Sequence, residues 1–294
     1  MSFLNYLING LSLGSVYAII ALGYTMVYGI AKMLNFAHGD IIMIGSYIVY
    51  STMSMAGMHP VIAILIAMIG CMALGVVTER VAYRPLRGAS SSLAVLITAI
   101  GVSYLLQNIA LLVFGADPKS FTSVIDWKGI TLFDGELQIR GTAIVTIAVG
   151  LLVLFGLQTF IHRTKSGQAM LAVAQDKGAA TLCGIDVNKT IAVTFAIGSS
   201  LAAVAGVLLC SAYPTITPYI GAMPGIKAFV AAVFGGIGSV PGAMIGGLTL
   251  GVIEILSRTY ISSQLADAIV FAILIVVLLV KPTGLLGKRV MEKV

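Results

Sequence analysis

Long apolar runs dominate this chain, and short polar stretches separate them. The runs fall at about 5–30, 41–58, 60–78, 93–115, 142–161, 190–212, 225–257 and 265–281. A transmembrane helix needs about 20 mainly apolar residues, and a helix satisfies its own backbone hydrogen bonds, which lipid cannot do. We therefore predict an all-α, polytopic membrane protein in which residues 1–294 form one transmembrane domain.

The seventh run, 225–257, is too long for a single crossing. Residues 235–242 (GGIGSVPG) interrupt it with four glycines and a proline. Glycine and proline are unfavourable inside a helix, so we expect two helices hinged on this break. The pattern then predicts eight to nine crossings with broken helices and leaves both counts open.

Composition agrees with the apolar pattern. Hydrophobic residues make up 59% of the chain and charged residues only 10%, against about 25% charged in soluble domains. So few charges could not cover the surface of a water-soluble protein of 294 residues. This excludes a soluble domain.

The basic residues predict the orientation, because Lys and Arg accumulate in cytoplasmic loops. Three polar stretches carry a basic excess, and with Lys32 they hold 12 of the 17 Lys and Arg residues. These are Lys32, Arg80, Arg84, Arg87, Arg163, Lys165, Lys177, Lys189, Lys281, Lys288, Arg289 and Lys293. We place them in the cytoplasm, with the C-terminus, and expect the N-terminus outside. Orientation accounts for the net charge of +6, so no nucleic-acid partner is needed.

The loop at about 116–141 has balanced charge, which places it on the outer face. Residues 121–139 are rich in β-favouring residues around a turn at Phe133, Asp134 and Gly135, which predicts a short hairpin. The loop is either a solvated connector or a docking surface with Trp127 as its anchor.

The motifs of an enzyme are absent from the sequence. It has no GxxxxGK[ST], HExxH or GxSxG motif, and its three histidines and three cysteines are scattered. We expect no catalytic residue, no metal site and no cofactor. Cys183 lies in a polar segment that we expect to be cytoplasmic.

Two polar breaks suggest a substrate path. One is 35–40 (NFAHGD) and the other is the glycine-rich break at 235–242. Transporters use broken helices where backbone groups face a cavity instead of lipid. For the first break, the alternative is an interfacial turn in which Asp40 caps the next helix. For the second, it is a plain loop between two spans.

Isolated charges and paired glycines give further expectations. We expect Glu254 and Asp267 near the outer ends of their helices and Lys227 extended outward to the membrane surface. Glycines recur at four-residue spacing, which allows close approach of helix backbones in membranes. The pairs are Gly10 and Gly14, Gly242 and Gly246, and Gly247 and Gly251.

The polar segment at about 162–190 has an alanine-rich centre followed by Gly184. This predicts a short helix that ends with the glycine at its C′ position. On the basic face such a helix is either a connector or a knob that fits a groove on a cytoplasmic partner.

Several motifs in order resemble the LivH-type permeases of branched-chain amino acid ABC importers. They are 9–18 (NGLSLGSVYA), 23–30 (GYTMVYGI), 35–40 (NFAHGD), 45–47 (GSY), 79–87 (ERVAYRPLR) and 234–242 (FGGIGSVPG). The resemblance runs along nearly the whole chain. It implies a multi-pass permease of a bacterial cytoplasmic membrane that moves Leu, Ile or Val inward by alternating access.

The resemblance also implies partners and site residues. The partners are a second, LivM-like permease subunit, two cytoplasmic ABC ATPase subunits that hydrolyse the ATP, and an extracytoplasmic substrate-binding protein. Path candidates are Asn35, Phe36, His38, Gly235, Gly236 and Gly238. ATPase-coupling candidates are Arg163, Gly167, Ala172, Asp176, Gly184 and Ile185. The family is often basic where this chain has Gln168 and Leu171.

Two alternatives stay open. A related permease for urea or short amides would show similar motifs. An ion-driven carrier or a channel would need no ATPase, although no relay of Asp, Glu and His within the spans suggests proton coupling.

Overall fold

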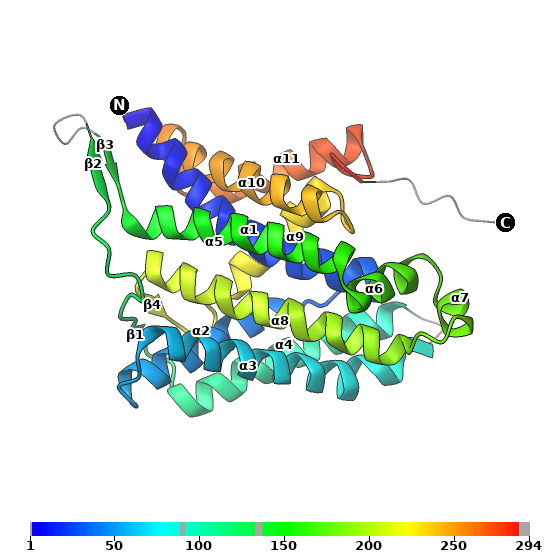
Figure 1. Cartoon of the computed structure of the whole chain (residues 1–294). Coiled ribbons are helices and arrows are strands. Elements are labelled where there is room, and N and C mark those ends of the chain that lie inside the picture. Colours follow the sequence, from blue (N-terminus) through cyan, green and yellow to red (C-terminus); the bar gives the residue numbers. More distant parts are fainter. Residues whose placement is uncertain (1, 89–91, 133–136, 288–294) are drawn as a thin grey trace.

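A computed structural model describes residues 2–88, 92–132 and 137–287 of the chain (Figure 1). The predicted turn at Phe133, Asp134 and Gly135 lies outside the described residues. So do three of the predicted cytoplasmic cations, Lys288, Arg289 and Lys293.

The described chain is almost entirely helical. Its longer helices are α1 (Ser2–Ala31), α2 (His38–Ser54), α3 (Pro60–Thr78), α4 (Ser92–Phe114), α5 (Gly141–Arg163), α8 (Val187–Ala212), α9 (Ala222–Gly235), α10 (Val240–Tyr260) and α11 (Ala266–Val280). Two short helices, α6 (Lys165–Gln175) and α7 (Lys177–Leu182), lie between α5 and α8. A π-helical turn η1 (Glu79–Tyr83) and a 3₁₀ turn η2 (Arg84–Gly88) extend α3.

Each predicted apolar run corresponds to a helix, and the seventh run divides into α9 and α10. The predicted glycine break is therefore confirmed. Within the described ranges, six helices are long and apolar enough to cross a membrane, and α9 and α11 are shorter apolar helices. The predicted fold class of an all-α membrane protein agrees with this structure, and the number of crossings stays a prediction.

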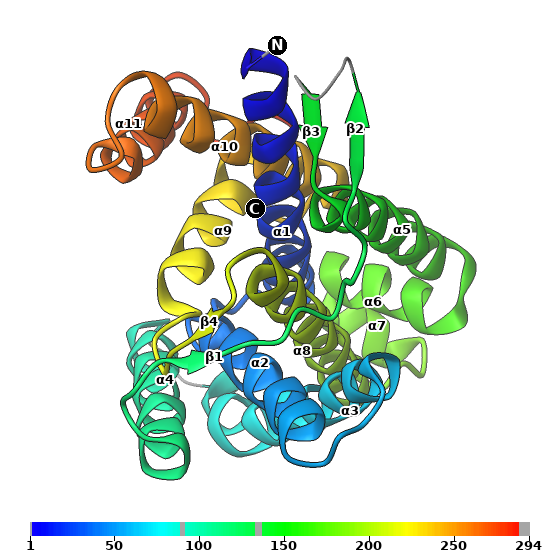
Figure 2. The same ribbon diagram turned by 90° about the vertical axis from the view of Figure 1, so that its left-hand side faces the viewer.

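Helices α1 and α8 form the centre of the bundle. In the most apolar 18-residue stretch of each helix, 89% of the stretch is buried in α1 and 83% in α8. The corresponding share is at most 28% in α3, α4 and α5. Figure 2 shows these three at the periphery of the bundle. Their exposed apolar side chains, such as Ile97, Leu112 and Leu152, fit a lipid or protein environment and not water.

The spaced glycines bring α1 and α10 into backbone contact. A Cβ added at Gly251 would lie 2.2 Å from Cα of Gly14, and one added at Gly247 would lie 2.4 Å from Cα of Ala18. Gly246 packs in the same way on α9, where a Cβ would lie 2.1 Å from the carbonyl oxygen of Ala231. The expectation of close helix packing at these glycines is confirmed.

The two ends of the bundle carry different structures (Figure 1). One end carries the N-terminus and four short strands. β2 (Ile130–Leu132) pairs antiparallel with β3 (Leu137–Ile139), and β1 (Lys119–Ser120) pairs with β4 (Thr215–Ile216). The predicted hairpin is present as β2 and β3, and Trp127 beside it is half-exposed.

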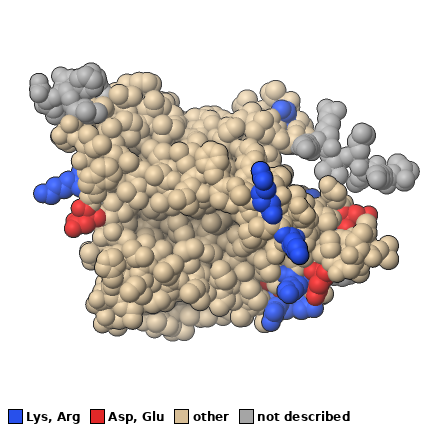
Figure 3. Space-filling view, in the orientation of Figure 1, with Lys and Arg blue, Asp and Glu red and all other residues tan. Residues whose placement is uncertain are grey.

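The opposite end carries α6, α7 and most of the Lys and Arg side chains visible in Figure 3. The predicted outer loop and the predicted cytoplasmic segment therefore lie at opposite ends of the molecule.

Candidate functional site

The first broken segment returns into the bundle instead of lying at its end. The chain leaves α1 at Ala31 and is non-helical until α2 begins at His38. The His38 ring lies 4.7 Å from the Tyr24 ring, centroid to centroid. Tyr24 lies two turns before the end of α1, about 10 Å along its axis. The start of α2 is thus buried inside the bundle.

The turn that makes this return is unusual. Lys32, directly after α1, has a φ of 58° and is the one non-glycine residue with positive φ among those the structure describes. This conformation costs free energy for a residue with a Cβ. The reversal is therefore held by the surrounding packing and not by local preference.

The first turns of α2 and α9 meet beside α1. A Cβ at Gly221 would lie 1.8 Å from the carbonyl oxygen of Gly39, and one at Gly225 would lie 2.8 Å from Cα of Gly39. Only glycines allow this contact. Two helices that are shorter than a full crossing thus begin together within the bundle, which is the arrangement of broken helices in many transporters.

A cavity of about 450 Å³ lies beside these two helix starts. We call it the Asp40 cavity. Its wall comes from α1, the 32–37 segment, α2, α4, the turn before α9, and α9 itself. The lining residues are Tyr24, Phe36, Gly39, Asp40, Ile100, Ser103, Tyr104, Gln107, Tyr219, Ala222, Gly225 and Ile226.

The polar groups of the cavity converge on one carboxylate. Nε2 of Gln107 donates to Oδ1 of Asp40 at 2.8 Å and to Oγ of Ser103 at 3.3 Å. Asp40 is 3% exposed. The interpretation of Asp40 as a helix cap is wrong, because Ala37 is the N-cap of α2 and makes no side-chain cap bond.

The three path candidates of the first break have different positions. Phe36 lines the cavity and packs against Phe229. Asn35 and His38 are buried behind it, where Oδ1 of Asn35 accepts a 2.7 Å hydrogen bond from the hydroxyl of Tyr83. Tyr83 belongs to the π-helical turn η1. Asn35 thus ties the break to the end of α3.

The second break lies at the end of the bundle that carries α6. Gly236 and Gly238 have φ of 107° and 93°, which only glycine adopts readily. A Cβ at Gly235 would lie 1.9 Å from the carbonyl oxygen of Gly242, so the chain doubles back tightly here. Gly238 lines a separate cavity of about 490 Å³, together with Met170 of α6.

The structure therefore does not bring the six path candidates into one cavity. Ser103 and Gln107 were not among the predicted path residues, and Asp40 was predicted only as a cap. Gln107 carried a usable signal, since it is a strongly polar residue within the apolar run at 93–115.

The coupling segment forms two helices and not the single one predicted. Asp176 separates them and caps α7, since its Oδ1 accepts from the amide of Ala179 at 3.0 Å. Gly184 ends α7 at C′ with a φ of 79°, as predicted. The amides of Gly184 and Ile185 donate to the carbonyls of Thr181 and Ala180, which is a Schellman motif.

The coupling candidates differ in exposure. Arg163, Asp176 and Gly184 are exposed, whereas Ala172 and Ile185 are half-buried. Gly167 is buried. Its backbone packs so closely on α5 that an added Cβ would lie 2.4 Å from Cα of Ile161. The most exposed apolar side chain of the segment is Leu182, at 92%.

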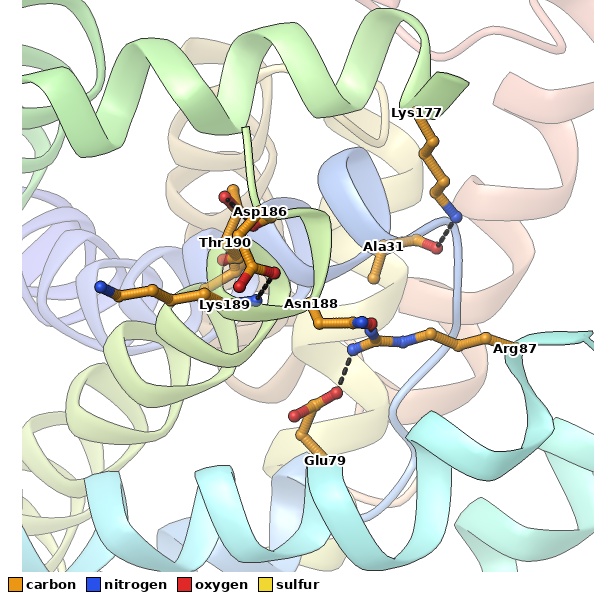
Figure 4. A network of polar contacts seen from close by, with 9 residues as sticks. Ala31, Glu79, Arg87, Lys177, Asp186, Asn188, Lys189 and Thr190 are labelled. Atoms are coloured by element: carbon orange, nitrogen blue, oxygen red, sulfur yellow. Dashed lines mark hydrogen bonds and ion pairs between the residues drawn. The ribbon is translucent and has the colours of Figure 1, made fainter. Parts of the chain in front are cut away.

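Polar contacts connect this segment to the first break (Figure 4). Nζ of Lys177 donates to the carbonyl of Ala31, the last residue of α1, at 3.2 Å. Nearby, Arg87 pairs with Glu79 and donates to Oδ1 of Asn188 at 2.7 Å. Partial burial and the charges of Arg87 and Lys32 lower the pKa of the Lys177 ammonium. α7 thus contacts the point where the chain leaves α1.

Glu254 lies near the end of α10 and Asp267 in the first turn of α11, as expected, and both pair with a buried Lys227 in one charge cluster, although Asp267 itself is 41% exposed. Lys227 is 3% exposed, and its Nζ lies 2.7 Å from Oε1 of Glu254 and 2.6 Å from Oδ1 of Asp267. Arg258 also pairs with Glu254, and the Tyr17 hydroxyl donates to Oε2 of Glu254 at 2.9 Å. The expectation that Lys227 extends outward is wrong, because burying it beside two carboxylates neutralises its charge.

Comparisons with known proteins match almost the entire length of the chain. The family described as "Branched-chain amino acid transport system / permease component" matches residues 6–278. The high-affinity branched-chain amino acid transport system permease protein BraD of Pseudomonas aeruginosa is 46% identical over 99% of this chain and 98% of that protein. LivH of Salmonella typhimurium, which has the same description, is 47% identical over the same shares. A probable LivH of Methanocaldococcus jannaschii is 28% identical over 92% of this chain and 88% of that protein.

Proposed function

Because this chain belongs to the family of branched-chain amino acid transport permeases, we propose that it is the membrane subunit of an ATP-driven importer of Leu, Ile and Val. The observation that carries the proposal is identity of 46–47% over 99% of the chain with permeases of that description. These relatives support the amino-acid substrate and not the urea alternative. The chain is a transport component and not an enzyme.

The importer needs partners for energy and for substrate delivery. We expect cytoplasmic ATPase subunits, two in number, an extracytoplasmic binding protein, and a second permease subunit of the same family. The membrane is the bacterial cytoplasmic membrane, with the N-terminus outside and the C-terminus inside. The concentration of Lys and Arg at the end that carries α6 and α7 supports this orientation (Figure 3).

The contacts of α7 suggest how a movement of the ATPase subunits is transmitted to the residues that line the substrate path. An ATPase that moves Leu182 and the rest of α7 would pull on the Lys177 contact to Ala31. Ala31 is followed by the 32–37 segment, whose Phe36 lines the Asp40 cavity. Arg163, Asp176 and Gly184 would face the ATPase, while Gly167, Ala172 and Ile185 would hold the segment in shape.

Uptake of labelled leucine tests the substrate class. Cells that lack their own leucine uptake, when supplied with this chain and its partners, should accumulate leucine, and excess isoleucine or valine should lower the uptake at least about tenfold. Excess urea should leave it unchanged. Competition by urea, together with accumulation of labelled urea, would favour the urea alternative.

Labelling of Cys183 tests both the orientation and the ATPase contact. Cys183 is exposed on the coupling segment, whereas Cys71 and Cys210 are buried. A membrane-impermeant maleimide should therefore label Cys183 in inside-out vesicles and not in intact cells, and bound ATPase subunits should slow the labelling.

A Trp127→Cys variant in a Cys183→Ser background is the matched control, because Trp127 is half-exposed and shortly precedes β2, which lies at the end of the bundle opposite α7. It should react in intact cells. Labelling of Cys183 from outside would reverse the proposed orientation.

A further inference from the structure

The Asp40 carboxylate differs from the other buried acids of the bundle, because no cation pairs with it. Among the described residues, Glu254 pairs with Lys227 and Arg258, and Glu79 pairs with Arg87. Asp40 instead accepts from the neutral amide of Gln107, which also donates to Ser103. An acid in a membrane interior that is not neutralised by the protein is costly, and such residues mark ligand or ion paths.

The surroundings of Asp40 fit a small molecule with one cationic and one apolar end. The carboxylate lies on the wall of a cavity of about 450 Å³. The rest of the wall is mainly apolar or aromatic, with Phe36, Ile100 and Ile226 as examples. Gln107, which also donates to Ser103, holds the carboxylate in place, so an arriving cation adds to an existing hydrogen-bond network.

We propose that Asp40 binds the α-ammonium of an amino acid in transit, while the apolar cavity wall contacts its branched side chain. This proposal rests on the proposed function and names Asp40 as a residue that determines which substrate the permease accepts. A neutral molecule such as urea makes no ion pair with Asp40. Gln107 is a positioning residue that orients the carboxylate.

The charge of Asp40 can be tested without transport. Ile226→Cys in a Cys183→Ser background places a thiol on the cavity wall of the full complex in vesicles. A cationic methanethiosulfonate should react faster with this thiol than an anionic one of similar size. Asp40→Asn should lower that ratio about tenfold and leave the rate of a neutral methanethiosulfonate unchanged. An unchanged ratio overturns the proposal.

Uptake of leucine tests the role of the charge. Asp40→Asn should lower uptake by the full complex at least tenfold, and Asp40→Glu should restore part of it. Asp117→Asn, which removes an exposed acid of the outer loop, is the matched control and should transport normally. Normal uptake by Asp40→Asn overturns the inference, whereas no uptake by the unmodified complex contradicts the proposed function instead.

A further measurement remains decisive if Asp40→Asn does not assemble. With Asp40 intact, leucine with binding protein and ATP should slow the reaction of the neutral reagent at Ile226→Cys. Absence of protection in a complex that transports leucine would place the substrate elsewhere and overturn the proposal.

Discussion

Replacement of Lys227 by methionine should lower the free energy of unfolding by about 2 kcal/mol, since it leaves the buried Glu254 with Arg258 as its one remaining cationic partner among the described residues. Lys227 contacts both Glu254 and Asp267 and joins α9, α10 and α11. Methionine is unbranched and one atom shorter than lysine, so it keeps most of the packing and removes the ammonium group. Unfolding of the purified chain in mixed micelles, titrated with a denaturing detergent, measures the loss.

Two comparisons control this prediction. Lys165→Met removes an exposed lysine of α6 and should change stability by less than about 0.5 kcal/mol. Adding Glu254→Gln to Lys227→Met should recover part of the loss, because the buried negative charge is then removed as well. Equal stability of Lys227→Met and the unchanged chain would mean that the cluster contributes nothing.

Replacement of Leu182 by glutamate should weaken binding of the ATPase subunits at least about tenfold and abolish ATP-driven uptake. Leu182 is 92% exposed at the end of α7, where the chain alone gains nothing from an apolar side chain. Contact with an apolar groove on an ATPase subunit would explain the exposed leucine. A carboxylate buried in such a groove would cost binding free energy. Co-purification of the complex and leucine uptake measure the two effects.

Thr122→Glu is the matched control for this variant. It adds the same single carboxylate at an exposed position in the outer loop and should leave assembly intact. Leu182→Met should also assemble, since it keeps the apolar character. Normal assembly and uptake by Leu182→Glu would show that α7 does not contact the ATPase through this side chain.

Local features of the sequence predicted much of the fold. Apolar runs predicted the helices because lipid leaves few alternatives for the backbone. Gly184 predicted the end of α7 because its conformation is open mainly to glycine, and glycines at four-residue spacing, such as Gly247 and Gly251, predicted close packing because they carry no Cβ. Each of these features depends on residues near one another in the chain.

The buried polar groups were harder to predict, because their partners are distant in sequence. Lys227 is 27 residues from Glu254, and Asp40 is 67 residues from Gln107. Nothing near Lys227 in the sequence indicates that two carboxylates neutralise it. The Asp40 cavity needs α2, α4 and α9 together, so Asp40 alone could be read as a helix cap.

Leucine uptake into vesicles with a defined set of components tests the central claim most directly. Vesicles that contain this chain, its permease partner and the ATPase subunits should accumulate leucine only when ATP and the binding protein are both supplied. Vesicles with this chain alone should show no uptake with or without an ion gradient. Uptake by the chain alone would contradict the account and favour a self-sufficient carrier or channel.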